Sequence, residues 1–158
     1  MTEQQKTFMK MAIDLSQKGM DSGKGGPFGC IIVHNGKVVG KGANSVSSTN
    51  DPTAHAEVVA IRDACQNLGN FQLEDCEIYT SCEPCPMCLG AIYWARPKAV
   101  FYANSKEDAA EAGFDDQFIY EELDKPIDNR KIKFHQLMKD EAKVVFQNWM
   151  AKENKTLY

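Results

Sequence analysis

Four residues combine metal-binding and proton-transferring side chains at spacings that suit one catalytic site: His55, Glu57, Cys85 and Cys88. Cys85 and Cys88 are three positions apart, so on a helix they share one face and can present both sulfurs to one ion. His55 and Glu57 are two positions apart, which is roughly 200° around a helix axis. Their side chains can therefore reach the same site only if that site lies beyond the N-terminal end of the helix. The sequence therefore predicts a metal ion between the starts of two helices, whose positive ends favour thiolate over thiol.

The predicted ligand set of one imidazole and two thiolates is typical of a catalytic zinc site, because the fourth tetrahedral position stays open for water. The metal lowers the pKa of that water toward neutrality. A carboxylate beside it can take the proton and pass it on, and Glu57 is placed for that role. Such a site suits attack of hydroxide on an amidine carbon of a heteroaromatic ring, with Glu57 protonating first the ring nitrogen and then the departing amine.

Spacing alone leaves other interpretations of the cysteines open. Cys82 could complete a closed structural zinc site with the other three ligands, as in a non-catalytic zinc module that acts through protein contacts. A redox pair formed by Cys85 and Cys88 would leave His55 and Glu57 without a role. The presence of a carboxylate at position 57 favours the catalytic interpretation.

Length and composition indicate one ordinary globular domain spanning residues 1–158. A chain of 158 residues buries about two-thirds of its unfolded surface. Hydrophobic residues make up 43% and charged residues 25%, which excludes disordered and fibrous classes. The formal net charge of −4 argues against a nucleic acid partner, because binding to a phosphate backbone depends chiefly on Lys and Arg.

No segment is typical of secretion or membrane insertion. The first residues, MTEQQKTFMKMA, carry polar and charged groups where a secretory signal needs an apolar core, and no later run is apolar for long enough to span a bilayer. We therefore expect a cytoplasmic protein without membrane contact. In that compartment the six cysteines are expected to be thiols or metal ligands, with Cys30, Cys65 and Cys76 in the core.

Hydrophobic periodicity predicts alternating helices and strands. We expect helices near 3–18, from about 52 to 68, 84–95, 105–123 in two pieces broken near Gly113, and 139–153. We expect strands over 30–33, 37–39, 77–81, 98–103 and 131–138. Asn35-Gly36 between the first two strands is a strong hairpin signal. The third strand, the helix over 84–95 and the fourth strand form a βαβ unit, which implies parallel pairing.

The combination of AHAE with PCPMC is typical of zinc-dependent nucleobase deaminases. The segments GGPFG, NDPTAHAE, TSCEPCPMCLGAIYWARPKAVFYA and AGFDD together resemble the small guanine deaminases of the cytidine-deaminase-like superfamily, and the similarity runs from about residue 5 to Tyr158. The resemblance implies a three-layer α/β/α fold with a mixed five-stranded sheet. It also implies hydrolysis of guanine to xanthine and ammonia.

The resemblance further implies one zinc ion per chain, with His55, Cys85 and Cys88 as ligands and Glu57 as the proton shuttle. A homodimer is implied as well, in which the two subunits exchange a C-terminal segment of about 139–158. Its small-molecule partner would be a purine base.

Five further residues match positions that contact the purine in this family: Phe28, Asn44, Ala56, Asp116 and Tyr158. By resemblance, Asn44 hydrogen-bonds the base, Phe28 stacks on it and the backbone near Ala56 contacts it. Asp116 accepts a hydrogen bond from the exocyclic amine, and Tyr158 closes the pocket. A carboxylate suits guanine, which presents donors at N1 and at the 2-amino group. On composition alone, Phe28 would be a core residue, Asp116 a helix cap and Tyr158 a frayed end.

The nearest alternative is an enzyme that deaminates adenosine in tRNA, which shares the metal motif and a similar length. Such an enzyme needs a basic face and a pocket for a flipped base. Acidic residues outnumber basic ones here, 22 to 18, and the chain ends in an aromatic residue, Tyr158, where an RNA-binding protein is expected to carry basic ones. These features favour a small purine over RNA.

Overall fold

The computed structural model describes residues 1–114 and 116–158, in two compact units, Met1–Asp116 and Gln117–Tyr158. The first unit contains a mixed four-stranded sheet in the order β2-β1-β3-β4. β1 is antiparallel to β2 and β3, whereas β3 and β4 are parallel. The strands are β1 (Gly29–His34), β2 (Lys37–Ala43), β3 (Cys76–Cys82) and β4 (Ala99–Asn104).

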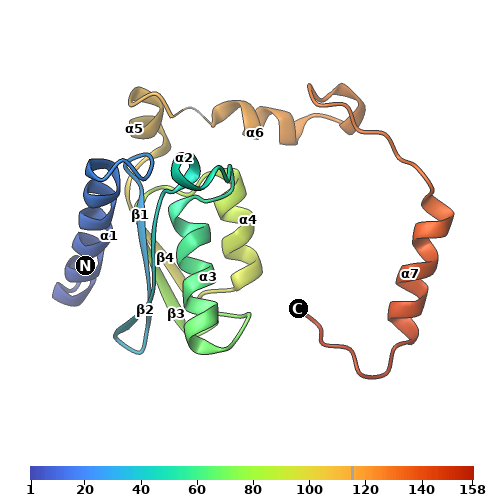
Figure 1. Ribbon diagram of the computed structural model, residues 1–158, viewed down its shortest axis with the longest axis horizontal. Helices are drawn as coiled ribbons and strands as arrows, with labels where there is room; N and C mark the ends of the chain where they lie inside the picture. Colours follow the sequence, from blue (N-terminus) through green and yellow to red (C-terminus); the bar gives the residue numbers. More distant parts are fainter. Residues whose placement is uncertain (115) are drawn as a thin grey trace. The chain divides into compact units, whose positions relative to one another are not determined.

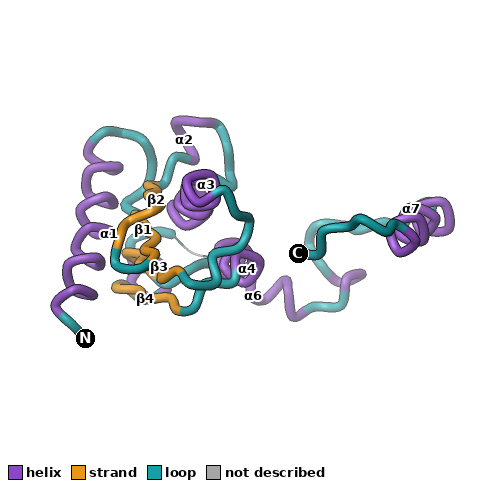
Figure 2. The backbone as a smooth tube through the Cα atoms, turned by 90° about the horizontal axis from the view of Figure 1, so that it is seen from below, coloured by secondary structure: helices purple, strands orange, loops and turns teal. Residues whose placement is uncertain are grey.

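Helices cover both faces of this sheet, as Figures 1 and 2 show: α1 (Glu3–Asp21) lies on one face, and α3 (Ala56–Leu68) and α4 (Pro86–Ala95) lie on the other. The side chains of β1 alternate between the two layers. Cys30 and Ile32 pack in the cluster that contains the small residues of α3, while Ile31 and Val33 pack with α1. All four side chains are buried, as expected for an interior strand that is covered on both faces. The predicted α/β fold with a mixed sheet is confirmed.

Local signals explain where the elements of the first unit begin and end. The turn between β1 and β2 has positive φ angles at Asn35 and Gly36, as the Asn-Gly pair predicts. Thr2 and Gln5 form a capping box at the start of α1. α3 ends at Gly69 in the left-handed conformation, the usual use of glycine after a helix.

Two glycines of β2 let α3 lie directly on the sheet. A Cβ atom at Gly42 would collide with the carbonyl oxygen of Ala56, the first residue of α3. A Cβ atom at Gly40 would lie 2.5 Å from the carbonyl oxygen of Ala60, one turn further along. The absence of side chains at these positions thus fixes how closely the N-terminus of α3 approaches the strands.

The second helix begins later than predicted, because residues before it form a separate turn. The carboxylate of Asp51 accepts hydrogen bonds from the backbone N–H of Thr53 at 2.8 Å and from its hydroxyl at 2.7 Å. The backbone N–H of His55 donates to the carbonyl of Thr53 at 2.8 Å. A short helix not predicted from the sequence, α2 (Val46–Thr49), precedes this turn.

The remaining helices are α5 (Lys106–Glu111) in the first unit, and α6 (Gln117–Asp124), the 3-10 turn η1 (Ile127–Asn129) and α7 (Lys139–Ala151) in the second. The predicted break near Gly113 is confirmed, and that glycine has a φ of +89°. Among the described residues, no helix is both long and apolar enough to cross a membrane.

The predicted fifth strand over 131–138 is wrong for the structure, whose sheet has four strands. A strand exists only where a second backbone takes up its hydrogen bonds. In the described part of the second unit these residues form bends and irregular chain without strand pairing. The alternating side chains of Ile132 and Phe134, which suggested a strand, are instead exposed to 74% and 51%.

Candidate metal centre

His55 and Cys85 hold equivalent places in the two helices that cover one face of the sheet. Each is the N-cap residue, His55 of α3 with φ −70° and ψ 155°, and Cys85 of α4 with φ −65° and ψ 167°. These extended conformations turn the chain just before each helix begins. Pro86 then occupies the first position of α4, where its missing N–H has no cost.

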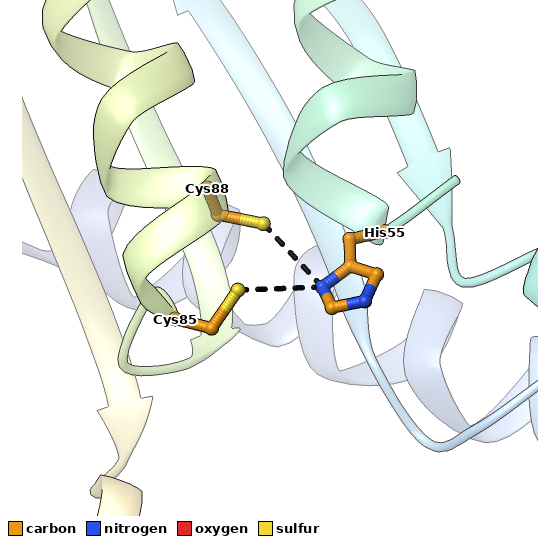
Figure 3. Close-up of side chains that lie close together, drawn as sticks. All are labelled: His55, Cys85 and Cys88. Atoms are coloured by element: carbon orange, nitrogen blue, oxygen red, sulfur yellow. Dashed lines mark hydrogen bonds between the residues drawn. The ribbon is translucent and has the colours of Figure 1, made fainter. Parts of the chain in front are cut away.

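The structure brings together the side chains of His55, Cys85 and Cys88, as Figure 3 shows. The Nδ1 atom of His55 lies 3.5 Å from the sulfur of Cys85 and 3.5 Å from that of Cys88. All three donor atoms lie within 4.8 Å of one another. Zinc bonds of about 2.3 Å to sulfur and about 2.0 Å to nitrogen, at a tetrahedral angle, place those atoms about 3.5 Å apart. The donor set therefore fits a zinc ion.

The sulfurs are electrostatically unequal before a metal arrives. A hydrogen bond from the Cys88 thiol lowers the pKa of Cys85 to about 4, and the same bond together with burial raises the pKa of Cys88. A hydrogen bond with Cys85 also raises the pKa of the His55 imidazole. Cys85 is thus the ready anionic ligand, and a cation that binds there displaces the proton left on Cys88.

Cys82 takes no part in this group. Its sulfur is buried and donates to the carbonyl oxygen of Ser105 at 3.5 Å, in the turn that begins α5. Within the described part of the chain, the side chains whose donor atoms lie close enough together to bind one metal ion are those of His55, Cys85 and Cys88. The geometry therefore supports an open site with three protein ligands over the closed structural site considered from spacing.

Glu57 lies beside the ligands in the first turn of α3, with 6% of its surface exposed. Its Oε2 atom lies 3.4 Å from the sulfur of Cys88, and its Oε1 atom accepts a hydrogen bond from the hydroxyl of Thr80 at 3.2 Å. Burial raises the pKa of the Glu57 carboxyl. A carboxyl group with a raised pKa, next to a metal site, is suited to taking up and returning a proton.

Sequence reasoning missed the contact between Thr80 and Glu57. A signal was present, because a hydroxyl residue stands on the same face of β3 as Ile78 in an otherwise apolar environment, and Thr80 is 1% exposed. The contact depends on how the start of α3 packs on the sheet, where this helix lies mainly on β2 and β1, and the sequence pattern did not specify that packing.

The predicted purine contacts in the first unit surround the start of α3. The Oδ1 atom of Asn44 accepts from the backbone N–H groups of Gly26 and Val46 at 3.2 and 3.3 Å. Its oxygen is thus committed to the backbone, and its amide nitrogen is the group that it can offer to a ligand. The backbone of Asn44 donates to the carbonyl of Phe28 at 3.0 Å, which ties these two residues together. Ala56 is fully buried at the first position of α3.

The ring of Phe28 packs edge-on against Phe114, with centroids 4.9 Å apart and an interplanar angle of 84°. Asp116 is half-buried and close enough to His55 for its charge to raise the pKa of the imidazole. Asp115 of the same motif lies outside the described residues. Tyr158 belongs to the second unit, so its place in the pocket stays a prediction.

Comparison with known proteins agrees with this site. Residues 2–104 match the family model described as the cytidine and deoxycytidylate deaminase zinc-binding region. Guanine deaminase of Bacillus subtilis (strain 168) is 59% identical over 152 residues, which are 96% of this chain and 97% of the relative. A tRNA-specific adenosine deaminase of Aquifex aeolicus (strain VF5) is 34% identical over 92% of this chain and 93% of its own.

Among solved structures, the X-ray structure of guanine deaminase from Bacillus subtilis superposes with a TM-score of 0.95 at 57% identity, over 100% of this chain and 99% of that one. The agreement extends over both the metal-binding helices and the sheet that carries them. Because the family model covers most of the first unit, including all three metal-binding side chains, the chain belongs to the cytidine and deoxycytidylate deaminase zinc-binding family.

Proposed function

We propose that this protein is a zinc-dependent guanine deaminase that hydrolyses guanine to xanthine and ammonia. The observation that carries the proposal is the meeting of His55, Cys85 and Cys88 with the buried carboxylate of Glu57 beside them. The identity of 59% to a relative named guanine deaminase supports this substrate.

His55, Cys85 and Cys88 would hold the zinc ion, which when bound acts as a Lewis acid and lowers the pKa of a water molecule. Glu57 takes the first proton of that water and delivers it to the ring nitrogen beside the attacked C2 atom. It then passes the second proton to the departing amine. The oxygen of one water thus ends in the new C2 carbonyl, and its two protons end on the ring and in ammonia.

Specificity for guanine would come from hydrogen-bond donors and acceptors around the carboxylate of Glu57. Asp116 accepts from the exocyclic 2-amino group, which leaves as ammonia, in a charge-assisted hydrogen bond. The amide nitrogen of Asn44, whose oxygen is used by the backbone, donates to an acceptor of the purine. Phe28, braced by Phe114, stacks on the base, and the backbone of Ala56 contacts it.

The second candidate is deamination of adenosine in tRNA, favoured by the 34% identity to a tRNA-specific adenosine deaminase. The net charge of −4 speaks against a polyanionic substrate. The identity to this tRNA-specific relative, 34%, is lower than the 59% identity to the guanine deaminase, so deamination of tRNA is the second candidate.

The active form would be a homodimer in which the C-terminal segment of about 139–158 is exchanged, so that Tyr158 closes the partner's pocket. Exposed apolar side chains on both units support this arrangement. In the second unit they include Ile132, Phe134, Leu137, Val145, Phe146 and Met150. In the first unit they include Leu89, Tyr93 and Trp94 of α4 and Tyr102 of β4. Patches of this kind mark surfaces that are covered by another chain.

The edge of the sheet suggests where the exchanged chain docks. β4 lies at the end of the strand order, so its outer backbone groups can pair with another strand. All six cysteines are free thiols, in keeping with the reducing cytoplasm where we place the enzyme.

A substrate panel tests the proposed function directly. Purified protein, with its zinc content counted, is incubated with guanine, adenine, cytosine, cytidine and a tRNA anticodon stem-loop. Ammonia release from guanine, at about one zinc per chain, is the expected result. Turnover of the stem-loop without turnover of guanine would favour the second candidate instead.

A further inference from the structure

Thr80 lies in the interior of the sheet, directly beneath the proton-transferring carboxylate. It pairs with Cys30 of β1 on one side and with Tyr102 of β4 on the other, so its backbone is held from both edges. Its side chain is 1% exposed, and a β-branched side chain on a strand has restricted χ1 freedom. The Thr80 side chain is therefore held in place by the buried interior of the sheet.

The two oxygens of the Glu57 carboxylate have different surroundings. Oε1 accepts the hydroxyl of Thr80 at 3.2 Å, whereas Oε2 lies 3.4 Å from the sulfur of Cys88. One oxygen thus faces the sheet and the other faces the metal-binding side chains. This orientation is the one that a proton shuttle needs, because the oxygen that exchanges protons must be on the side of the reacting atoms.

The two contacts differ in what holds each partner. Cys88 belongs to the group of metal-binding side chains, whereas the Thr80 hydroxyl lies outside that group, on β3. The hydroxyl is therefore the contact that anchors the carboxylate to the sheet.

We propose that Thr80 is a positioning residue for the deamination: its hydroxyl holds Oε1 of Glu57 so that Oε2 stays directed at the metal-binding side chains through both proton transfers. This inference rests on the proposed function, in which Glu57 carries each proton. A Glu side chain free to rotate would lose the near-attack geometry between the two transfers.

A pair of substitutions separates this role from simple packing. Thr80→Val keeps the shape and strand preference of the side chain but removes the hydroxyl, and Thr80→Ser keeps the hydroxyl and removes a methyl group. Zinc-loaded Thr80→Val should show kcat lowered about tenfold to a hundredfold, the effect of losing one hydrogen bond to a charged group. Its KM for guanine and its zinc content should stay within about twofold of the parent, since Thr80 is neither one of the grouped metal-binding side chains nor one of the proposed purine contacts. Thr80→Ser should restore kcat.

The neighbouring residue provides a matched control. Ser81 is also buried in β3, and its hydroxyl accepts from the backbone N–H of Gly29 at 3.0 Å, away from Glu57. Ser81→Ala should lower the unfolding temperature and leave kcat unchanged. Equal losses of kcat in Ser81→Ala and Thr80→Val would show that the loss reflects a damaged strand, and would overturn the proposal.

Two further measurements complete the test. In the Glu57→Gln background, Thr80→Val should cause no additional loss of residual kcat, because both changes disable one unit. Crystal structures of zinc-loaded Thr80→Val and Thr80→Ser should show the residue 57 carboxylate displaced in the first and retained in the second. A carboxylate that stays in place without the hydroxyl refutes the anchor. Absence of guanine turnover in the parent protein would refute the proposed function itself, whereas turnover that Thr80→Val leaves intact would refute only the role of Thr80.

Discussion

The Nδ1 atom of His55 and the sulfur of Cys85 lie 3.5 Å apart, and each belongs to the N-cap residue of its own helix. Two helix N-termini, with their partial positive charges, therefore converge on one set of donor atoms. Both chain segments must keep their helical register for the donors to meet.

Replacement of Glu57 by Gln should leave zinc bound and lower kcat by at least about a hundredfold, the low end for loss of a general acid or base. The amide keeps the volume of the carboxyl group but cannot shuttle a proton. Zinc content by atomic absorption and steady-state rates with guanine provide the measurement. Glu77→Gln is the control, because Glu77 lies on β3 and contacts Tyr79 and Lys98 instead of the metal-binding side chains. Full activity in the Glu57 variant would dismiss the mechanism.

Replacement of Gly42 by Ala should destabilise the fold by about 1–3 kcal/mol, the usual cost of overpacking. The added methyl group would push the carbonyl of Ala56 outward, and with it the start of α3 that carries His55. We expect weaker zinc retention against a chelator as well as a lower urea midpoint. Gly90→Ala in α4 is the counterpart: nothing lies within 4 Å of the added Cβ, so it should stabilise by roughly 0.5–1 kcal/mol. If Gly42→Ala leaves zinc retention unchanged, zinc binding does not require α3 to lie so close to β2.

Replacement of Asp51 by Ala should weaken the turn before His55, with an effect that depends on pH. Hydrogen bonds from the Thr53 hydroxyl and N–H lower the pKa of Asp51 from its usual value of 3.8, so folding favours the ionised form. The stabilisation is therefore present above the unfolded pKa and is lost as the pH falls through the lower, folded pKa. The difference in urea midpoint between the parent and Asp51→Ala should be full at about pH 7 and should shrink below about pH 4. Asp51→Asn accepts a hydrogen bond but does not titrate, so its urea midpoint should differ from that of Asp51→Ala by the same amount at every pH. If the difference between the parent and Asp51→Ala did not change with pH, the lowered pKa of Asp51 would be contradicted.

Deletion of the last residues through Tyr158 should leave a folded protein with weakened activity. If the tail closes the pocket of a second copy, a mixture of truncated chains with Glu57→Gln chains should regain activity, since the intact tail of one completes the intact metal site of the other. Light scattering should report a dimer throughout. Full activity after truncation would contradict a role of the tail in the pocket. So would a mixture whose activity does not exceed the summed activities of the two variants measured separately.

Much of the metal site was predictable because its information is local. The spacing of Cys85 and Cys88 specifies one helix face, and the His-x-Glu pattern specifies a helix start. The hairpin at Asn35 follows from a backbone conformation that few residue pairs adopt. Each of these features depends on residues within a few positions of one another.

Features that depend on distant contacts were harder to predict. The hydrogen bond between Thr80 and Glu57 joins residues 23 positions apart, and it forms only because α3 packs on the sheet, mainly on β2 and β1. The predicted strand over 131–138 has the correct side-chain alternation, but a strand also needs a neighbour, and no described part of its own unit provides one. A pattern in one chain specifies which faces are apolar and leaves open what covers them.

The left-handed ends of α3 and α4, at Gly69 and Arg96, lie at the opposite end of these helices from the ligands. With 13 residues in α3, that separation is about 20 Å along the helix axis. The exposed loop that follows α3 contains Phe71 and is thus a suitable attachment point for a fluorescent reporter or a resin linker. Chain inserted there would leave the catalytic end untouched, so immobilised or labelled protein should retain its turnover.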